Sequence, residues 1–209
     1  MHPAAPTNAP RQASRRTFLY VLTGSVGAAG LAAALWPLVD HMNPDAAARA
    51  AGDLVTADLA DLHPGAQRIV FWHRLPIFVA HRTTAMLDAM RAPTFAAQLI
   101  DADSQARQQP SYARNWHRSI DPRYAVLVGV CTACGCVPRF VAEAMPDAVT
   151  GGYLCPCCAS RYDPAGRAHA GPARFNLPVP PYQLDARSTL TLGKNPAGEL
   201  FTLDAVERI

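Results

Sequence analysis

The hydrophobic residues of this chain form one long uninterrupted run, which is followed by many short ones. The long run is Phe18–Leu38, 21 residues without a charged side chain. A helix of about 20 apolar residues crosses the roughly 30 Å hydrocarbon core of a bilayer. Arg15 and Arg16 precede the run and Asp40 follows it, so the positive-inside bias predicts a cytoplasmic N-terminus. The pattern therefore predicts a single transmembrane helix, with everything after His41 on the far side of the membrane.

The short apolar runs after this anchor are typical of β-strands. Gln67–Trp72 and Leu75–Ala80 are rich in β-branched and aromatic residues and predict a hairpin. Its turn, His73-Arg74, has neither the glycine nor the asparagine that such turns prefer. Further strands are expected at Tyr124–Val130, Leu177–Leu184, Thr189–Leu192 and Phe201–Leu203, and short helices at Thr84–Met90 and Pro93–Ile100. The sequence thus predicts a mostly β head with one helical insertion.

The dipeptide Asn43-Pro44 ends the predicted membrane helix, because the residue before a proline avoids the helical region and proline cannot continue the hydrogen-bond ladder. A tether then connects the anchor to the head, and its sequence is equally compatible with a plain spacer and a functional hinge. The predicted organisation is a cytoplasmic segment at 1–17, the transmembrane anchor at 18–38, the tether at 39–53 and the head at 54–209.

The arginine pair in front of the anchor indicates a particular export route. The stretch Ser14-Arg15-Arg16-Thr17-Phe18-Leu19 looks like a twin-arginine signal, which directs proteins across the membrane already folded. Folded export suits a cofactor that is loaded in the cytoplasm. The alternative is a secretory peptide cleaved near Ala32-Ala33-Ala34. We expect the segment to be retained as an anchor, because its apolar run is longer than an ordinary signal core.

Composition excludes several other classes of protein. The 209 residues, half of them hydrophobic, support one well-buried domain with accessories. The net charge is only +3 and the 19 prolines are scattered, so the chain has neither the basic excess of a nucleic-acid-binding protein nor a low-complexity repeat. The remaining chemistry lies in the cysteines.

All six cysteines of the chain fall in two short clusters. Cys131 and Cys134 form one Cys-x-x-Cys pair, and Cys155 and Cys158 form a second after 20 intervening residues. Two such pairs commonly converge on one tetrahedral zinc or iron ion. The remaining two cysteines, Cys136 and Cys157, are expected to close as a disulfide in an oxidising compartment. Three disulfides without a metal are the alternative, although paired Cys-x-x-Cys loops suit metals better.

The residues around the cysteines resemble the Rieske iron-sulfur subunit of the cytochrome bc1 complex almost from end to end. The resemblance includes the arginine pair, the anchor and the hairpin with Trp72. Its most specific parts are Gly129-Val130-Cys131-Thr132, Gly135-Cys136-Val137-Pro138, Gly151-Gly152-Tyr153-Leu154-Cys155-Pro156-Cys157, Ser160-Arg161-Tyr162-Asp163-Pro164, Gly171-Pro172-Ala173 and Asn176-Leu177-Pro178-Val179-Pro180-Pro181-Tyr182. This resemblance implies a Rieske-type head, an antiparallel β-sandwich with a cluster-binding subdomain at about 126–182.

The family pattern is Cys-Thr-His-Leu-Gly-Cys and Cys-Pro-Cys-His-Gly-Ser, in which two cysteines and two histidines hold a [2Fe-2S] cluster. Cys131 and Cys155 match the thiolate ligands, Cys136 and Cys157 match a disulfide that clamps the two loops, and Ser160 and Tyr162 match hydroxyls that donate hydrogen bonds to the cluster. Neither histidine is present. Ala133 stands at the first histidine position, Cys158 at the second, and Cys134 replaces the loop leucine.

This departure predicts different redox chemistry. Histidine ligation raises Rieske potentials to about −150 to +300 mV, against about −400 mV for all-cysteine plant-type centres. In the family an exposed ligand imidazole also takes the proton of the quinol, which neither Ala133 nor Cys158 can do. His117 and His169 are the nearest histidines in the sequence, and we expect both to be ordinary hydrogen-bonded or surface side chains.

Two functions follow from the resemblance. The first is an iron-sulfur electron-transfer subunit of a ubiquinol:cytochrome c oxidoreductase, single-pass in the bacterial inner membrane with a periplasmic head, which passes electrons from ubiquinol at cytochrome b to cytochrome c1. Its [2Fe-2S] cluster would be held by Cys131, Cys155, Cys158 and either Cys134 or a group that the sequence does not identify. The second is a degenerate paralogue in which the same four thiols hold zinc or a single iron as a structural site, without quinol oxidation. No catalytic residue is expected in either case.

Overall fold

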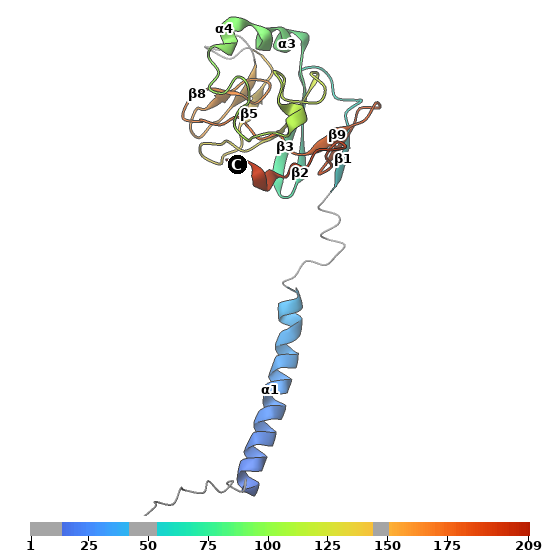
Figure 1. Cartoon of the computed structure of the whole chain (residues 1–209), viewed down its shortest axis with the longest axis vertical. Coiled ribbons are helices and arrows are strands. Elements are labelled where there is room, and N and C mark those ends of the chain that lie inside the picture. The colour runs from blue at the N-terminus through green and yellow to red at the C-terminus, as the bar shows by residue number, and fades with distance from the viewer. Residues whose placement is uncertain (1–13, 42–53, 144–150) are drawn as a thin grey trace, which may run out of the picture. The chain divides into compact units, whose positions relative to one another are not determined.

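The computed structural model describes residues 14–41, 54–143 and 151–209, which fall into two units (Figure 1). One is the helix α1 (Arg15–His41), and the other is the head, described from Leu54 onward. Residues 42–53, which contain most of the predicted tether, lie outside the described residues, as do residues 1–13.

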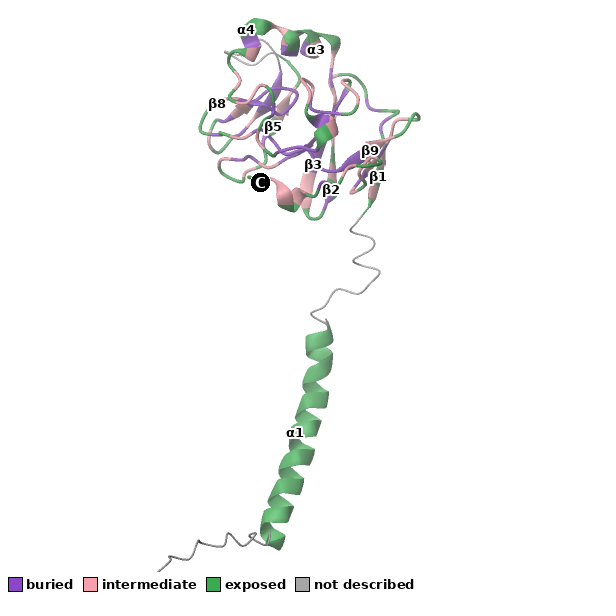
Figure 2. Ribbon diagram, viewed as in Figure 1, coloured by how far each residue is buried: buried purple, intermediate pink, exposed green. Residues whose placement is uncertain are grey.

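Helix α1 contains the whole predicted apolar run. It is long and apolar enough to cross a membrane, and Figure 2 shows it exposed along its length. Pro37 lies inside the helix, close to its C-terminal end. An unpacked surface of this kind, with large side chains such as Phe18 and Trp36 more than half exposed, suits a lipid environment better than water.

The head is built from three antiparallel sheets, which confirms the mostly β prediction. One sheet has the order β1-β10-β9, the second β2-β3-β4 and the third β5-β6-β7-β8. The strands are β1 (Val55–Asp58), β2 (Gln67–Trp72), β3 (Leu75–His81), β4 (Tyr124–Val128), β5 (Arg139–Val141), β6 (Gly152–Leu154), β7 (Arg161–Tyr162), β8 (Ala168–Ala170), β9 (Tyr182–Leu184) and β10 (Thr189–Leu192).

The predicted hairpin is present as β2 and β3, with Trp72 paired to Leu75. Its turn residues, His73 and Arg74, have φ angles of 49° and 64°. Two successive left-handed residues match the right-handed twist of the flanking strands. The hairpin therefore forms the turn that its sequence disfavours, because the pairing of β2 with β3, whose residues Ile77–Ala80 are buried, outweighs the local preference.

Four of the predicted elements differ from the structure in type or by at least two residues, and the first of them is Tyr124–Val130, which ends at Val128 as β4. The expected helix Pro93–Ile100 shortens to α4 (Pro93–Ala96), since the N–H group of Ile100 instead bonds to the carbonyl of Ala168 in β8. The expected strand Leu177–Leu184 is a strand only in β9, because the prolines before Tyr182 have no N–H group for a ladder. Phe201–Leu203 is not a strand, and it leads into the 3-10 turn η2 (Leu203–Ala205).

The helical insertion is confirmed as α3 (Thr84–Arg91), whose first turn is capped by the Thr83 hydroxyl. A second 3-10 turn, η1 (Ser111–Ala113), follows α4 along the chain. Figure 1 shows α3 and α4 over one end of the head, beside β8. The Phe95 ring of α4 packs edge-on against His169 of β8, so the insertion is fastened to the third sheet.

The hydrophobic core draws on all three sheets, with Ile77 of β3, Tyr153 of β6 and Leu190 of β10 among its buried residues. The β3 ring of Phe78 stacks on Tyr153 of β6 with centroids 5.4 Å apart. Gly129, just after β4, lies so close to this Phe78 ring that a side-chain carbon there would meet it at 2.4 Å. This packing fixes the exit of β4, from which the first cysteine loop begins.

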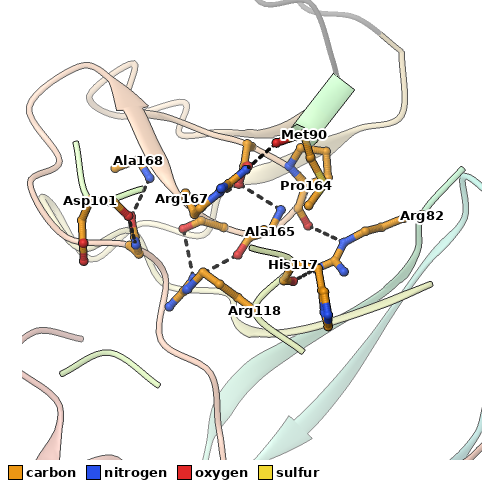
Figure 3. A network of polar contacts seen from close by, with 12 residues as sticks. Arg82, Met90, Asp101, His117, Arg118, Pro164, Ala165, Arg167 and Ala168 are labelled. Carbon is orange, nitrogen blue, oxygen red and sulfur yellow. Dashed lines mark hydrogen bonds and ion pairs between the residues drawn. The ribbon is translucent and has the colours of Figure 1, made fainter. Parts of the chain in front are cut away.

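A buried polar network holds the turn after β7 in place (Figure 3). Asp163 and Arg167 form an ion pair with both side chains at most 3% exposed. Arg82 donates to the carbonyl of Pro164, and Arg118 donates to that of Ala165. Burial lowers the pKa of Arg82 to about 10 and that of Arg118 to about 9, so both remain charged at neutral pH. The network immediately follows Tyr162, which contacts the candidate metal centre.

Candidate metal centre

Two loops of the same construction carry the six cysteines. The first, residues 131–136, follows β4, and the second, residues 155–160, connects β6 to β7. In the first loop, Gly135 donates to the carbonyl of Cys131, and Cys131 donates to the carbonyl of Cys136, both at 2.8 Å. The second loop repeats both bonds. Its donors Ala159 and Cys155 bond to the carbonyls of Cys155 and Ser160 at 3.0 and 2.8 Å.

The repeated construction extends to the residue after each Cys-x-x-Cys pair. Gly135 and Ala159 both adopt left-handed backbone, with φ angles of 75° and 56°. Glycine takes this conformation freely, whereas alanine adopts it at a cost of about 1–2 kcal/mol. Ala159 is therefore strained, and its left-handed backbone gives the second loop the same turn as the first.

Backbone N–H groups are directed at the sulfur atoms in the same pattern in both loops. The N–H groups of Ala133 and Cys134 hydrogen-bond to the Cys131 sulfur, and that of Cys136 to the Cys134 sulfur. The second loop provides the same three donors, from Cys157 and Cys158 to the Cys155 sulfur and from Ser160 to the Cys158 sulfur. Such donors stabilise negative charge on sulfur. The loops are therefore preorganised for thiolates.

The two loops bring four free cysteine sulfurs together. The Sγ atoms of Cys131 and Cys158 are 3.6 Å apart, those of Cys134 and Cys155 are 3.4 Å apart, and those of Cys134 and Cys158 are 3.3 Å apart. All four lie within 4.8 Å of one another. Cys131 and Cys155 are buried, whereas Cys134 is exposed and Cys158 half-buried. One edge of the cluster therefore faces solvent.

Four thiols at these distances cannot all ionise without a cation between them. Burial raises the pKa of Cys131, but the Tyr162 hydroxyl and two N–H groups more than offset this and bring it to about 6. The N–H group of Cys136 lowers the pKa of Cys134, but burial and the three neighbouring sulfurs raise it to about 12. Negative charge on one sulfur thus disfavours ionisation of its neighbours. A metal ion bound by all four thiolates would offset this repulsion.

Cys136 and Cys157 form the expected disulfide, which joins the two loops beside the free thiols with their Cα atoms 6.4 Å apart. A cross-link of this kind typically stabilises a domain by about 2–4 kcal/mol, chiefly by restricting the unfolded chain. The alternative of three disulfides disagrees with the structure, in which the other four cysteines are free.

Removing the disulfide should loosen the head before it affects the metal centre. In the double variant Cys136→Ser/Cys157→Ser we expect a loss of about 2–4 kcal/mol in the free energy of unfolding, measured by thermal or denaturant unfolding. Metal content per chain should stay close to that of the unmodified protein, because the four free thiols are unchanged. Loss of metal without loss of stability would contradict this division of roles. The matched control is Ala133→Ser, which adds one hydroxyl to the same loop.

Ser160 and Tyr162, predicted to support the centre, both contact cysteine sulfur. The Ser160 hydroxyl lies 3.1 Å from the Cys158 sulfur, and the Tyr162 hydroxyl lies 3.3 Å from the Cys131 sulfur. Tyr162 also accepts a hydrogen bond from the N–H group of Thr132. Both side chains come from the segment that the buried network holds in place.

The segment 171–175 is held against the two cysteine loops by contacts that are not evident from the sequence. Ala173 donates its N–H to the Ser160 hydroxyl, and the Thr132 hydroxyl donates to the carbonyl of Phe175. Gly171, with φ of 87°, lies where an added side-chain carbon would meet the Cα of Ser160 at 2.6 Å. The C-terminal Arg208 donates to the carbonyl of Thr132. No motif in the sequence indicated this last contact, which joins residues 76 positions apart.

Within the described part of the chain, no histidine takes part in the cysteine cluster. Among the described residues, the groups of clustered metal-binding side chains contain cysteines alone. The His117 ring lies 2.8 Å from the Ser119 hydroxyl, and burial lowers its pKa to about 4. His169 packs on Phe95. The His117 contact agrees with the expectation of an ordinary hydrogen-bonded side chain, whereas the buried Nε2 of His169 has no hydrogen-bond partner among the described residues.

Comparisons with known proteins place the chain in a family. It is 41% identical to a ubiquinol-cytochrome c reductase iron-sulfur subunit of Bradyrhizobium diazoefficiens, over 86% of this chain and 94% of that one. It is also 41% identical to the subunit of the same name from Allochromatium vinosum, over 87% and 89% of the two chains. The chain belongs to the family of ubiquinol-cytochrome c reductase iron-sulfur subunits.

The chain also matches one family model and one solved structure. Residues 6–45 match the family described as Ubiquitinol-cytochrome C reductase Fe-S subunit TAT signal. With the apolar helix α1, this match fits a membrane-anchored subunit. Among solved structures, a chain titled Hyperthermophilic respiratory Complex III is 22% identical, with a TM-score of 0.43, over 82% of this chain and 98% of that one.

The metal centre of this family member departs from the ligand set that the family pattern implies. Ala133 and Cys158 occupy the two histidine positions, and the four close sulfur atoms offer a ligand set of thiolates alone. These residues do not fit a cluster held by two cysteines and two histidines. They do fit an iron-sulfur or zinc centre bound by sulfur, since soft thiolate ligands select these metals.

Proposed function

We propose that this chain is the membrane-anchored iron-sulfur electron-transfer subunit of a ubiquinol:cytochrome c oxidoreductase, with a metal centre held by Cys131, Cys134, Cys155 and Cys158. In the family such a subunit carries electrons from ubiquinol at cytochrome b to cytochrome c1, and the thiolate ligands of this chain make ubiquinol a poor donor to its centre. The proposal places the N-terminus in the bacterial cytoplasm and the head in the periplasm, as the positive-inside bias at Arg15 and Arg16 favours.

The observation that carries the proposal is the convergence of four free sulfurs within 4.8 Å, in a head of a family whose members are iron-sulfur subunits. Inner-sphere sulfurs from both loops, six N–H donors and two hydroxyl contacts make a site that stabilises a bound, negatively charged centre. The exposed edge at Cys134 and Cys158 is where an electron would enter and leave.

Because neither histidine ligand is present, no ligand of this centre can accept the proton that the quinol releases with its electron. A thiolate-only centre carries more negative charge than one with neutral histidines, so its reduction potential is lower; between two-iron centres of the two kinds the difference is several hundred millivolts. At about 59 mV per tenfold change for one electron, electron transfer from quinol to this centre is strongly uphill. The quinol proton must then be accepted by a group other than the metal ligands of this chain.

The test is to purify the tagged full chain from its native membrane with its partners. We expect haem-containing cytochrome b and c1 subunits to copurify, and the head to show a reversible one-electron couple that dithionite reduces and ubiquinol barely reduces. A head without any one-electron couple would overturn the proposal. A head fully reduced by ubiquinol would contradict the low potential.

Replacing Tyr162 by phenylalanine should lower that potential further. The hydroxyl lies 3.3 Å from the Cys131 sulfur, and a hydrogen bond to sulfur favours the more negative, reduced state. If this hydrogen bond stabilises the reduced state by about 1 kcal/mol more than the oxidised state, its removal lowers the reduction potential by roughly 40 mV for one electron. Potentiometric titration measures the change.

The matched control for this variant is Tyr153→Phe. Tyr153 is fully buried in β6, and its hydroxyl has no hydrogen-bond partner within the described parts of the chain. Its replacement removes the same atom without touching a sulfur, so the potential should stay within about 10 mV. Equal shifts in the two variants would show that the Tyr162 hydroxyl does not act on the centre.

A structural zinc site is the second candidate. The observation that favours it is the closed arrangement of four sulfurs, because structural zinc sites are tetrahedral and leave no open position. In that case the chain is an assembly or interaction protein without electron transfer. One zinc per chain, with no one-electron couple in the purified head, would identify it.

A further inference from the structure

We infer that the four thiols hold a single metal ion, in place of the two-iron cluster expected from the family pattern. The inference rests on the proposed function, which requires that ion to be iron, cycling between Fe³⁺ and Fe²⁺ by gain and loss of one electron. It is carried by the separations of the sulfur atoms and by the way the two loops are constructed.

The four sulfur atoms cannot be grouped into the two separate pairs that a two-iron cluster requires. Such a cluster binds two protein ligands on each iron, and the two pairs lie on opposite sides of the bridging sulfides. Here close contacts join Cys131 to Cys158, Cys158 to Cys134 and Cys134 to Cys155, at 3.6, 3.3 and 3.4 Å. Any division of the four sulfurs into two pairs leaves at least one of these short contacts between the pairs. No room remains for a pair of bridging sulfides.

A single ion fits the same distances. Metal–sulfur bonds of about 2.3 Å in a tetrahedron place neighbouring sulfurs about 3.8 Å apart. The three close contacts of 3.3 to 3.6 Å are slightly shorter than this edge, and all four sulfurs lie within 4.8 Å of one another. These three contacts therefore need to lengthen by only a few tenths of an ångström to admit one ion.

The loops are constructed for this arrangement. Cys134 replaces the family's leucine and gives the first loop the same Cys-x-x-Cys spacing as the second. Each loop has the same pair of backbone hydrogen bonds and the same N–H donors to sulfur. Two equivalent loops facing each other supply two ligands apiece to one centre, as in closed zinc and iron sites.

The experiment determines metal stoichiometry and spectroscopy on the full chain, exported by a twin-arginine-competent host that is supplied with both iron and zinc. We expect one iron per chain and no acid-labile sulfide. The oxidised protein should give a high-spin ferric resonance that disappears on reduction, and X-ray absorption should show four sulfur neighbours and no iron–iron scattering.

The alternative results separate this inference from the proposed function. One result would be two iron and two sulfide ions per chain, with a paramagnetic resonance signal only in the reduced protein. It would overturn the single ion and leave electron transfer intact. One zinc on four sulfurs would support the single ion and overturn the proposed electron transfer. Cysteines found oxidised to further disulfides, with no metal, would overturn both. No variant is needed, so a failure to fold cannot confuse the result.

Discussion

Replacing Cys131 by serine should remove the metal. Cys131 is 1% exposed and its sulfur lies 3.6 Å from that of Cys158, so no other side chain can take its position. Binding energies of about 10–16 kcal/mol for four-ligand zinc sites correspond to roughly 3 kcal/mol per ligand. Loss of one thiolate should therefore weaken binding by about a hundredfold or more, and a hydroxyl is a poor substitute for a soft ligand. Metal analysis after gel filtration measures the effect.

The control for Cys131→Ser is Ala133→Ser, which places the same hydroxyl in the same loop without removing a thiolate. It should keep its full metal content. Because Cys131 is buried, the variant's fold must be checked by the strand signal of its circular dichroism and by its melting temperature. A folded Cys131→Ser head that retains all of its metal would show that the ligand assignment is wrong.

Restoring the family's ligands should change the centre altogether. The variant Ala133→His/Cys134→Leu/Cys158→His recreates the Cys-Thr-His-Leu-Gly-Cys pattern of the first loop and the histidine of the second. Two neutral imidazoles in place of thiolates reduce the negative charge on the centre, so its potential should rise by several hundred millivolts, into the range of about −150 to +300 mV. Two iron and two sulfide per chain should accompany the rise.

A pH-dependent potential is the second signature of this triple variant, since a ligand imidazole can lose its proton whereas a bound thiolate has none to lose. The single variant Cys134→Leu serves as the control. It removes one thiolate without supplying an imidazole, and should bind metal weakly. If the triple variant kept the original metal and the original potential, the histidine positions would not be what distinguishes this centre from the family pattern.

Local patterns in the sequence predicted the elements that depend on few partners. The apolar run Phe18–Leu38 lies inside α1, and the paired runs around His73-Arg74 form β2 and β3. The strand Thr189–Leu192 was predicted to the residue. The short strands β5 to β8 were missed, because two or three residues carry no detectable alternation and become strands only by pairing with one another. The contact of Arg208 with Thr132 was missed for a similar reason.

The sequence by itself determined the chemistry available to this protein: two Cys-x-x-Cys pairs, two further cysteines and no histidine at the family's ligand positions. Residue identity and spacing are enough for that, since ligand softness is a property of the side chain. Only the tertiary structure decided how far apart the four sulfurs lie. That distance depends on where β4, β6 and β7 deliver the two loops, on the disulfide between them and on the buried network behind Tyr162. The contacts that set it join residues far apart in the chain, and local sequence patterns carry no record of such distances.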